Sequence, residues 1–233
     1  MSSRFLKDTP SISSLTIGQL EVSIVKEARN LGVAMDNHMT LTTHVKNVCR
    51  SACHAIHKIG LIRKYIDRST AERLVHAFVT SRLDANNSLL YGLPATALAK
   101  LQRVQNCAIR LVTCAKKDCN ITSLRRELHW LPIKDRIVFK LLLLTYKSLH
   151  GMAPSYISDI IKVHVPQRTL RSNSKLLLNM PPSREASTAY YGERTFSVAG
   201  PTLWNKLPAR IQKAGSLTIF KRLLKTYLFD NPL

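Results

Sequence analysis

Arginine and lysine carry the clearest chemistry in this sequence, because they gather in short groups between apolar positions. The strongest groups are Arg63-Lys64 with Arg68, Lys116-Lys117, Arg125-Arg126, and Arg168 with Arg171. These side chains bind phosphate by charge, and an arginine guanidinium can hold one phosphate with two parallel hydrogen bonds. Any one group alone is typical of a solvated face, so the charge of the whole chain decides whether a polyanionic partner is indicated.

The whole chain carries a large excess of positive charge. It has 35 Lys and Arg against 14 Asp and Glu in 233 residues, a formal net charge of +21 and a pI near 10.2. The excess follows residue 36: residues 1–36 are neutral, residues 37–120 sum to +9 and residues 121–233 to +12. Because 45% of the residues are hydrophobic, a disordered basic tail is excluded. We therefore expect a folded protein that binds RNA, DNA or an RNA–DNA hybrid through backbone phosphates.

Patterns that typify enzymes are largely missing. The carboxylates are scattered, and the sequence has no Gly-x-Ser-x-Gly elbow and no phosphate-binding glycine loop. Cys49, Cys53 and His57 share one face of a predicted helix and could bind zinc with a further cysteine. They also lie beside an apolar stripe, where free cysteine commonly packs as a small hydrophobe. We expect no metal, no cofactor and no catalysis, with a metal-dependent nuclease as an alternative.

Hydrophobic periodicity predicts a mainly α chain that begins with a short β region. Residues 15–35 alternate at period two around Gly18-Gln19, which predicts a small hairpin-based sheet with a third strand near residues 31–35. From residue 40, apolar positions recur every three or four residues and predict a bundle of three helices. Ser69–Glu72 fits a capping box at the start of the second of these helices.

The second half of the chain is also predicted to be helical, with some extended segments. Residues 133–149, between Pro132 and Gly151, predict a central buried helix, and residues 217–228 predict a last amphipathic one. Residues 163–191 are expected to be extended. In His129-Trp130-Leu131-Pro132, the aromatic Trp130 flanked by leucine and proline is typical of core packing. We expect three parts: residues 1–36, 37–118 and 119–233.

The cysteine count and the N-terminus indicate an intracellular protein, nuclear or cytoplasmic. Five cysteines are an odd number, and the first residues contain no apolar signal-like run. The most apolar stretch, residues 137–149, is interrupted by lysines and is too short to span a bilayer. We therefore expect no membrane segment.

A series of short motifs resembles the end of the palm, the thumb and the C-terminal region of reverse transcriptases of non-LTR retrotransposons (LINE-type, jockey-like). The motifs are Asn30–Asp36, Ser81–Asp84, Leu89–Pro94, Leu101–Asn106, Leu128–Pro132, Leu149–Pro154, Arg168–Ser172, Tyr191–Phe196, Leu203–Pro208 and Phe220–Phe229. One departure is Asp84-Ala85-Asn86-Asn87, where the family often has Asp-Tyr-Cys-Asn. The family's paired catalytic aspartates, which would precede residue 15, are also absent.

The resemblance implies a polymerase fragment that binds template–primer without extending it. Residues 1–36 would be a palm-end hairpin remnant, residues 37–118 a thumb-like bundle and residues 119–233 a C-terminal helical domain. The missing polymerase palm is then a possible partner. The candidate thumb contacts are Lys46, Arg50, Arg63, Lys64, Arg103 and Arg110, and a second set is Arg125, Arg126, Arg168 and Arg171. A non-functional retroelement relic is the other alternative.

Overall fold

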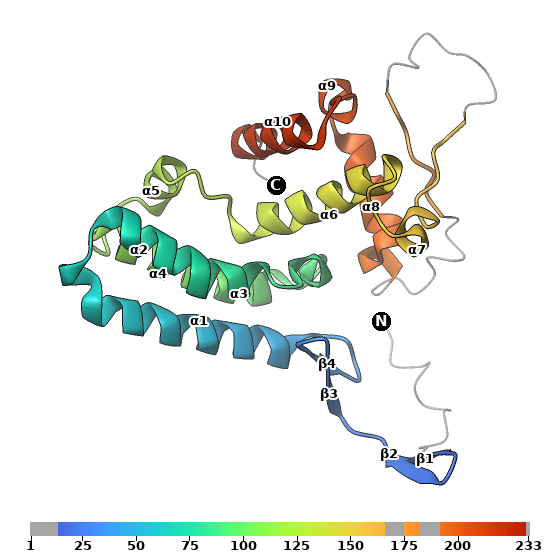
Figure 1. Cartoon of the computed structure of the whole chain (residues 1–233), viewed down its shortest axis with the longest axis horizontal. Helices are drawn as coiled ribbons and strands as arrows, with labels where there is room; N and C mark the ends of the chain where they lie inside the picture. Colours follow the sequence, from blue (N-terminus) through green and yellow to red (C-terminus); the bar gives the residue numbers. More distant parts are fainter. Residues whose placement is uncertain (1–13, 166–174, 182–191, 232–233) are drawn as a thin grey trace. The chain divides into compact units, whose positions relative to one another are not determined.

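A computed structural model describes residues 14–165, 175–181 and 192–231 of the chain. The chain divides into two units, Met1–His44 and Val45–Leu233, with the boundary inside the first long helix (Figure 1). The described part is mainly helical and has small antiparallel hairpins near its N-terminal end, so the expected fold class is confirmed. The expected division at residues 36 and 118 stays a prediction.

The first unit contains two separate hairpins. Their strands are β1 (Ser14–Ile17), β2 (Leu20–Ser23), β3 (Glu27–Asn30) and β4 (Val33–Asp36). Gly18 has a φ of +62° in the first turn, where the sequence predicts a turn. Leu31 and Gly32 both have positive φ in the second, as a type I′ hairpin turn requires. The prediction of one small sheet was wrong, because β4 pairs with β3 and not with the first hairpin.

Asp36 fixes the backbone between β4 and α1 (Thr42–Ile62). Its carboxylate accepts hydrogen bonds from the backbone N–H groups of His38, Thr40 and Leu41 at 3.1, 2.9 and 2.8 Å. Burial raises the pKa of Asp36, but these donors favour the ionised form and hold the pKa below its usual range. The stabilisation by Asp36 is therefore present above the pKa of the unfolded chain and is lost as the pH falls through the lower pKa of the folded protein.

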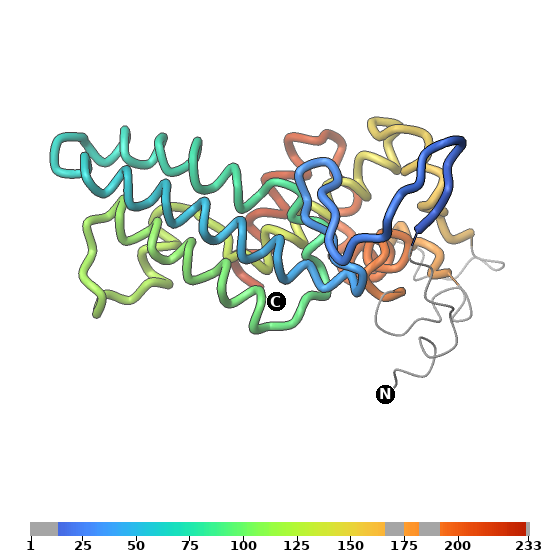
Figure 2. The backbone as a smooth tube through the Cα atoms, turned by 90° about the horizontal axis from the view of Figure 1, so that it is seen from below, coloured from blue at the N-terminus to red at the C-terminus, as the bar shows by residue number. Residues whose placement is uncertain are grey.

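Three helical runs form a bundle at the start of the second unit (Figure 1). They are α1; α2 (Arg68–Val75), η3 (His76–Thr80) and α3 (Ser81–Asp84); and α4 (Ala95–Thr113), with η2 (Arg63–Tyr65) and η4 (Asn87–Leu90) in the links. Figure 1 and Figure 2 show the three runs alongside one another, and α2 and η3 pack directly against α4. The buried side chains include Ala52, Ala55, Ile59, Val75, Val79, Leu101, Val104, Ala108 and Val112. The three predicted helices are therefore confirmed, with their apolar faces inward.

The middle run of this bundle departs from the sequence prediction in two ways. Asp67, and not Ser69, caps α2: its carboxylate accepts hydrogen bonds from the backbone N–H groups of Ser69 and Thr70, both at 3.2 Å. In addition, η3 is a π turn within an otherwise α-helical run. Beyond this turn, Arg82 donates a hydrogen bond to the backbone carbonyl of Ser51 in α1 at 2.8 Å and so joins the two runs.

The long helix α6 is the centre of the remaining structure and packs against α4, η4, α8 and α10. The further elements are α5 (Ile121–Glu127), α6 (Ile133–Leu149), α7 (Ser155–Ser158), η5 (Gly192–Arg194), α8 (Phe196–Lys206), α9 (Ala209–Gln212) and α10 (Leu217–Asp230). The ring of Tyr146 stacks on Phe220 at 4.2 Å between centroids, and its hydroxyl donates to the carbonyl of Ala214 at 2.8 Å. The buried helix predicted over residues 133–149 is confirmed, and the predicted last helix is two residues longer.

The predicted extended segment is described only in part. Val163 and Leu178 form an antiparallel bridge. Residues 166–174 and 182–191 lie outside the described residues. Across the described ranges, no helix has both the length and the apolar character that crossing a bilayer requires.

Replacement of Gly92 by alanine tests how closely the link after η4 packs on η5. Gly92 has a φ of +72°, and a Cβ there would lie 2.5 Å from Cγ of Arg194. Arg194 is held in place, since its Nε donates to the carbonyl of Tyr91 at 3.1 Å. We expect Gly92→Ala to lower the free energy of unfolding by about 2–4 kcal/mol in urea denaturation.

Gly151→Ala is the matched control for this substitution. Gly151 has a similar φ of +65° but nothing within 4 Å of the position of a Cβ. Its replacement adds backbone strain alone, and we expect a loss of about 1 kcal/mol. Equal losses at the two positions would show that Arg194 does not constrain Gly92.

Candidate nucleic-acid interface

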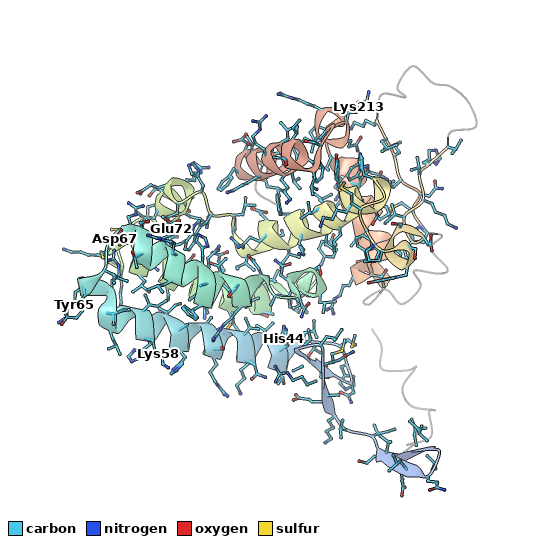
Figure 3. The ribbon with its side chains drawn as sticks, viewed as in Figure 1. His44, Lys58, Tyr65, Asp67, Glu72 and Lys213 are labelled. Atoms are coloured by element: carbon cyan, nitrogen blue, oxygen red, sulfur yellow. The ribbon has the colours of Figure 1, made fainter. Side chains whose placement is uncertain are left out.

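The outward face of α1 carries a row of basic side chains. Lys46, Arg50, His54 and Lys58 follow at intervals of four residues, and all four are exposed. Successive residues four apart are offset by about 40° around an α-helix and by about 6 Å along its axis, so the row turns gradually around α1. In Figure 3, Lys58 extends away from the other helices of the bundle. The row therefore presents positive charge to solvent over about 18 Å of helix.

Neighbouring carboxylates do not neutralise this row. Helix α1 contains no aspartate or glutamate. The ion pairs found among the described residues are Arg68–Glu127, His76–Glu72 and Arg136–Asp84. None of these pairs includes a residue of α1, so within the described part of the chain the row has no ionic partner.

Helix α4 extends the basic surface beside α1. Lys100, Arg103 and Cys107, at positions i, i+3 and i+7, are exposed on one face of α4. Both ends of this face border α1, since the charge of Lys100 acts on the thiol of Cys49 and Cys107 acts on Cys53. The α1–α4 basic surface is defined here as Lys46, Arg50, Lys58, Lys100 and Arg103.

The pKa values of Cys49 and Cys53, beside this surface, are raised above the usual thiol value. Burial raises the pKa of Cys49, the neighbouring Cys53 raises it further, and Lys100 opposes both effects only in part. Burial and Cys107 likewise raise the pKa of Cys53. Metals bind the thiolate form. Among the described residues, no three His, Cys, Asp or Glu side chains lie close enough together to hold a metal ion. This includes the predicted set of Cys49, Cys53 and His57.

Arg63, a predicted phosphate contact, caps the C-terminal end of α4. Its Nε and Nη2 donate to the backbone carbonyls of Leu111 and Val112, both at 2.9 Å, and Nη1 donates to the carbonyl of Ile66 at 2.8 Å. Carbonyls in the last turn of a helix lack intrahelical donors and carry the negative end of the helix dipole. The Arg63 guanidinium is therefore occupied in joining α1 to α4, and we place it outside the α1–α4 basic surface.

Lys64 and Arg110 differ in their exposure. Lys64 is exposed, and its ammonium lies 4.8 Å from the ring centroid of Tyr65. Arg110 is half-buried; its Nη2 donates to the carbonyl of Lys117 at 3.4 Å, and its Nε is buried with no partner among the described residues. Lys64 can reach a phosphate beyond the end of α1, whereas Arg110 is partly drawn into the fold.

The second set of predicted contacts is only partly described. Arg126 is exposed, whereas Arg125 is half-buried. Burial lowers the pKa of Arg125, and the nearby carboxylate of Asp135 opposes that effect. Arg125 therefore lies near the buried first turn of α6, and Arg126 lies in solvent. Arg168 and Arg171 fall outside the described residues.

The sequence analysis missed two members of the basic surface, Lys58 and Lys100. A signal for Lys58 was available, because it continues the four-residue interval of Lys46, Arg50 and His54. Lys100 had a signal within its own helix, since it lies three residues before Arg103 on the outer face. Its place in the surface depends on the packing of α4 beside α1, and a local pattern contains no information on that packing.

Comparison of the chain with protein-family models, with curated proteins and with solved structures found no match. The function of the basic surface is therefore argued from its own geometry and charge.

Arg63→Gln and Lys64→Gln test the assignment of adjacent basic residues to different roles. Arg63→Gln removes hydrogen bonds from a charged donor to the end of α4, and we expect a loss of about 2 kcal/mol in the free energy of unfolding. Lys64→Gln removes an exposed charge and should change stability by less than about 0.5 kcal/mol. Chemical denaturation of the two variants measures the difference. Similar stabilities would rule out the capping role of Arg63.

Proposed function

We propose that this chain binds RNA, DNA or their hybrid through phosphate contacts made by the α1–α4 basic surface. The observation that carries the proposal is the row Lys46, Arg50 and Lys58 on a helix that contains no acidic residue. Each strand of a nucleic acid places phosphates at short, regular intervals along its axis. Cations about 6 and 12 Å apart along the helix axis can lie along such a backbone and neutralise several phosphates at once.

The energetics of α1 support an external anion. Like charges four residues apart destabilise a helix by about 0.2–0.5 kcal/mol per pair. Lys46 with Arg50 is such a pair. Nothing on α1 itself offsets this repulsion. Phosphate groups along the row would relieve the repulsion, and counterions released from the nucleic acid would add to the binding free energy.

The placement of the acidic side chains supports binding and not phosphoryl transfer. Two-metal phosphoryl transfer requires carboxylates that hold ions about 4 Å apart. Here the carboxylates serve turns, caps and ion pairs: Asp36 holds a turn, Asp67 caps α2 and Asp84 pairs with Arg136. The resemblance to the thumb of non-LTR reverse transcriptases supports the same role, contact with the template–primer backbone without extension of the primer.

A salt titration tests this proposal. Five neutralised phosphates predict a slope of about −4.5 for the logarithm of the binding constant of a labelled duplex against the logarithm of salt concentration. The variant Lys46→Gln/Arg50→Gln/Lys58→Gln should retain two contacts, with a slope of about −2. Fluorescence anisotropy at several salt concentrations measures both slopes. A shuffled duplex should give the same affinity, since phosphates carry no sequence information.

The matched control is Lys213→Gln/Lys221→Gln/Arg222→Gln. These three side chains are exposed on other elements, and Figure 3 marks Lys213 near α9. The control removes the same charge from the chain, so it separates the location of the charge from its total. We expect its slope to equal that of the unmodified protein. A slope near zero for the unmodified protein, or equal slopes for the two triple variants, would refute the assigned interface.

A further inference from the structure

A pocket of about 490 Å³ is lined by the α2–α3 run and η4, by α6 with the segment before it, and by α10. Figure 3 marks Glu72, which lines it from α2. Leu128, Phe139 and Leu143 form an apolar wall, and polar side chains complete the lining. The volume is within the range of ~300–1,000 Å³ that is typical of small-molecule sites. Two buried polar atoms in this lining have no hydrogen-bond partner among the described residues.

The first of these atoms is the indole nitrogen of Trp130. The side chain is 4% exposed, and its Nε1 has no hydrogen-bond partner in the described part of the chain. Neighbouring contacts fix its position: the Trp130 backbone N–H donates to the carbonyl of Arg125 at 3.0 Å, and the ring lies 5.0 Å from that of His76. Buried donors almost always have a partner. The prediction of core packing for Trp130 is therefore confirmed for its ring but does not account for its N–H group.

The second atom is Oδ1 of Asn87, an acceptor. Asn87 is also 4% exposed, and Oδ1 lacks a partner among the described residues. Its amide Nδ2 donates to Oδ1 of Asp84 at 3.4 Å, and Asp84 in turn accepts from Nε of Arg136 at 2.8 Å. These contacts orient the amide, and both Asn87 and Trp130, each with one buried polar atom that lacks a partner among the described residues, line the pocket.

Two lysines supply positive charge at the same pocket. Arg136 is paired with Asp84, and His76 lies 3.6 Å from Glu72. Lys140 of α6 and Lys225 of α10 also line the pocket and belong to none of the ion pairs found in the described residues. The pocket thus combines an apolar wall, two buried polar groups and two lysines outside these ion pairs, although the ammonium of Lys225 also lies 6.0 Å from the ring centroid of Phe229.

We propose that this pocket binds one nucleotide, with its base against Trp130 and Asn87 and its phosphate near Lys140 and Lys225. The pairing edge of a nucleobase carries a donor and an acceptor side by side, and proteins read an unstacked base by hydrogen bonds to this edge and by apolar walls. The nucleotide is either free or an unpaired unit of a bound strand. Only in the second case does the inference rest on the proposed function.

The indole N–H signal of Trp130 reports directly on the proposed site. In a ¹H–¹⁵N NMR titration with adenosine or cytidine 5′-monophosphate, we expect this signal to shift and its exchange with water to slow. Trp204 is the internal control, since its Nε1 already donates to the carbonyl of Leu176 at 2.8 Å and should not respond. Trp130→Phe assigns the signal. Ribose 5-phosphate, which has no base, should leave both signals unchanged.

The role of the lysines is tested by comparison of nucleotide with nucleoside. Adenosine should bind about tenfold more weakly than its 5′-monophosphate, because it lacks the charged group. Lys140→Gln/Lys225→Gln should abolish that difference. Lys134→Gln, an exposed change on α6 outside this pocket, is the matched control and should preserve it. An unchanged preference for the monophosphate in the double variant would remove the lysines from the site.

Two further experiments distinguish a free nucleotide from an unpaired unit of a strand, and the nucleotide site from the α1–α4 basic surface. A single-stranded oligonucleotide that shifts the Trp130 signal when mononucleotides do not identifies an unpaired unit of a strand as the ligand. The Lys46→Gln/Arg50→Gln/Lys58→Gln variant should retain mononucleotide binding, and Trp130→Phe should retain the salt slope for a duplex. A Trp130 signal unmoved by every mononucleotide and by the oligonucleotide, or moved equally by ribose 5-phosphate, would overturn the nucleotide site whatever the duplex result.

Discussion

Two glutamines of α4 fix the point at which α6 begins, and most of the second unit depends on this contact. Nε2 of Gln105 donates to the carbonyl of Leu131 at 2.8 Å, and Oε1 of Gln102 accepts from the backbone N–H of Ile133 at 2.9 Å. The two side chains also hydrogen-bond each other at 2.8 Å. Loss of a partner for a buried polar group costs about 1–3 kcal/mol. The pair therefore holds the three-helix bundle to α6, and with it the position of Trp130.

The sequence was informative wherever a local pattern determined the structure. The apolar run after Pro132 identified α6 with its observed bounds, and Gly18 marked an observed turn. The sequence was misleading where either of two neighbouring residues could cap the same helix. Asp67 and Ser69 are both favoured helix caps, and the capping-box pattern selected Ser69, whereas the structure uses Asp67. The pairing of β4 with β3 alone is likewise a choice between partners that strand periodicity does not distinguish.

In the candidate site, too, the sequence predicted what depends on one helix and not what depends on contacts between residues far apart in the chain. Lys46, Arg50 and Arg103 are exposed, as their positions on predicted amphipathic helices suggested. Arg63 could not be separated from them by sequence, because a long arginine side chain can reach either solvent or a helix end. Its two partners in α4 lie 48 and 49 residues away. The indole N–H of Trp130, which has no hydrogen-bond partner among the described residues, could not be found from the sequence, since hydrogen bonding in a packed interior depends on the fold.

The π turn η3 allows His76 and Asp84 to face the same pocket, because it changes the angle between them around the helix axis. Eight residues of uninterrupted α-helix would leave His76 and Asp84 about 80° apart around the axis. The turn accommodates about one extra residue, or about 100°, which brings the two side chains to within about 20° of a common face. Both line the pocket. Deletion of a single residue from this turn would make the helix more regular, yet it would rotate Asp84 away from Arg136 and leave the guanidinium without its carboxylate.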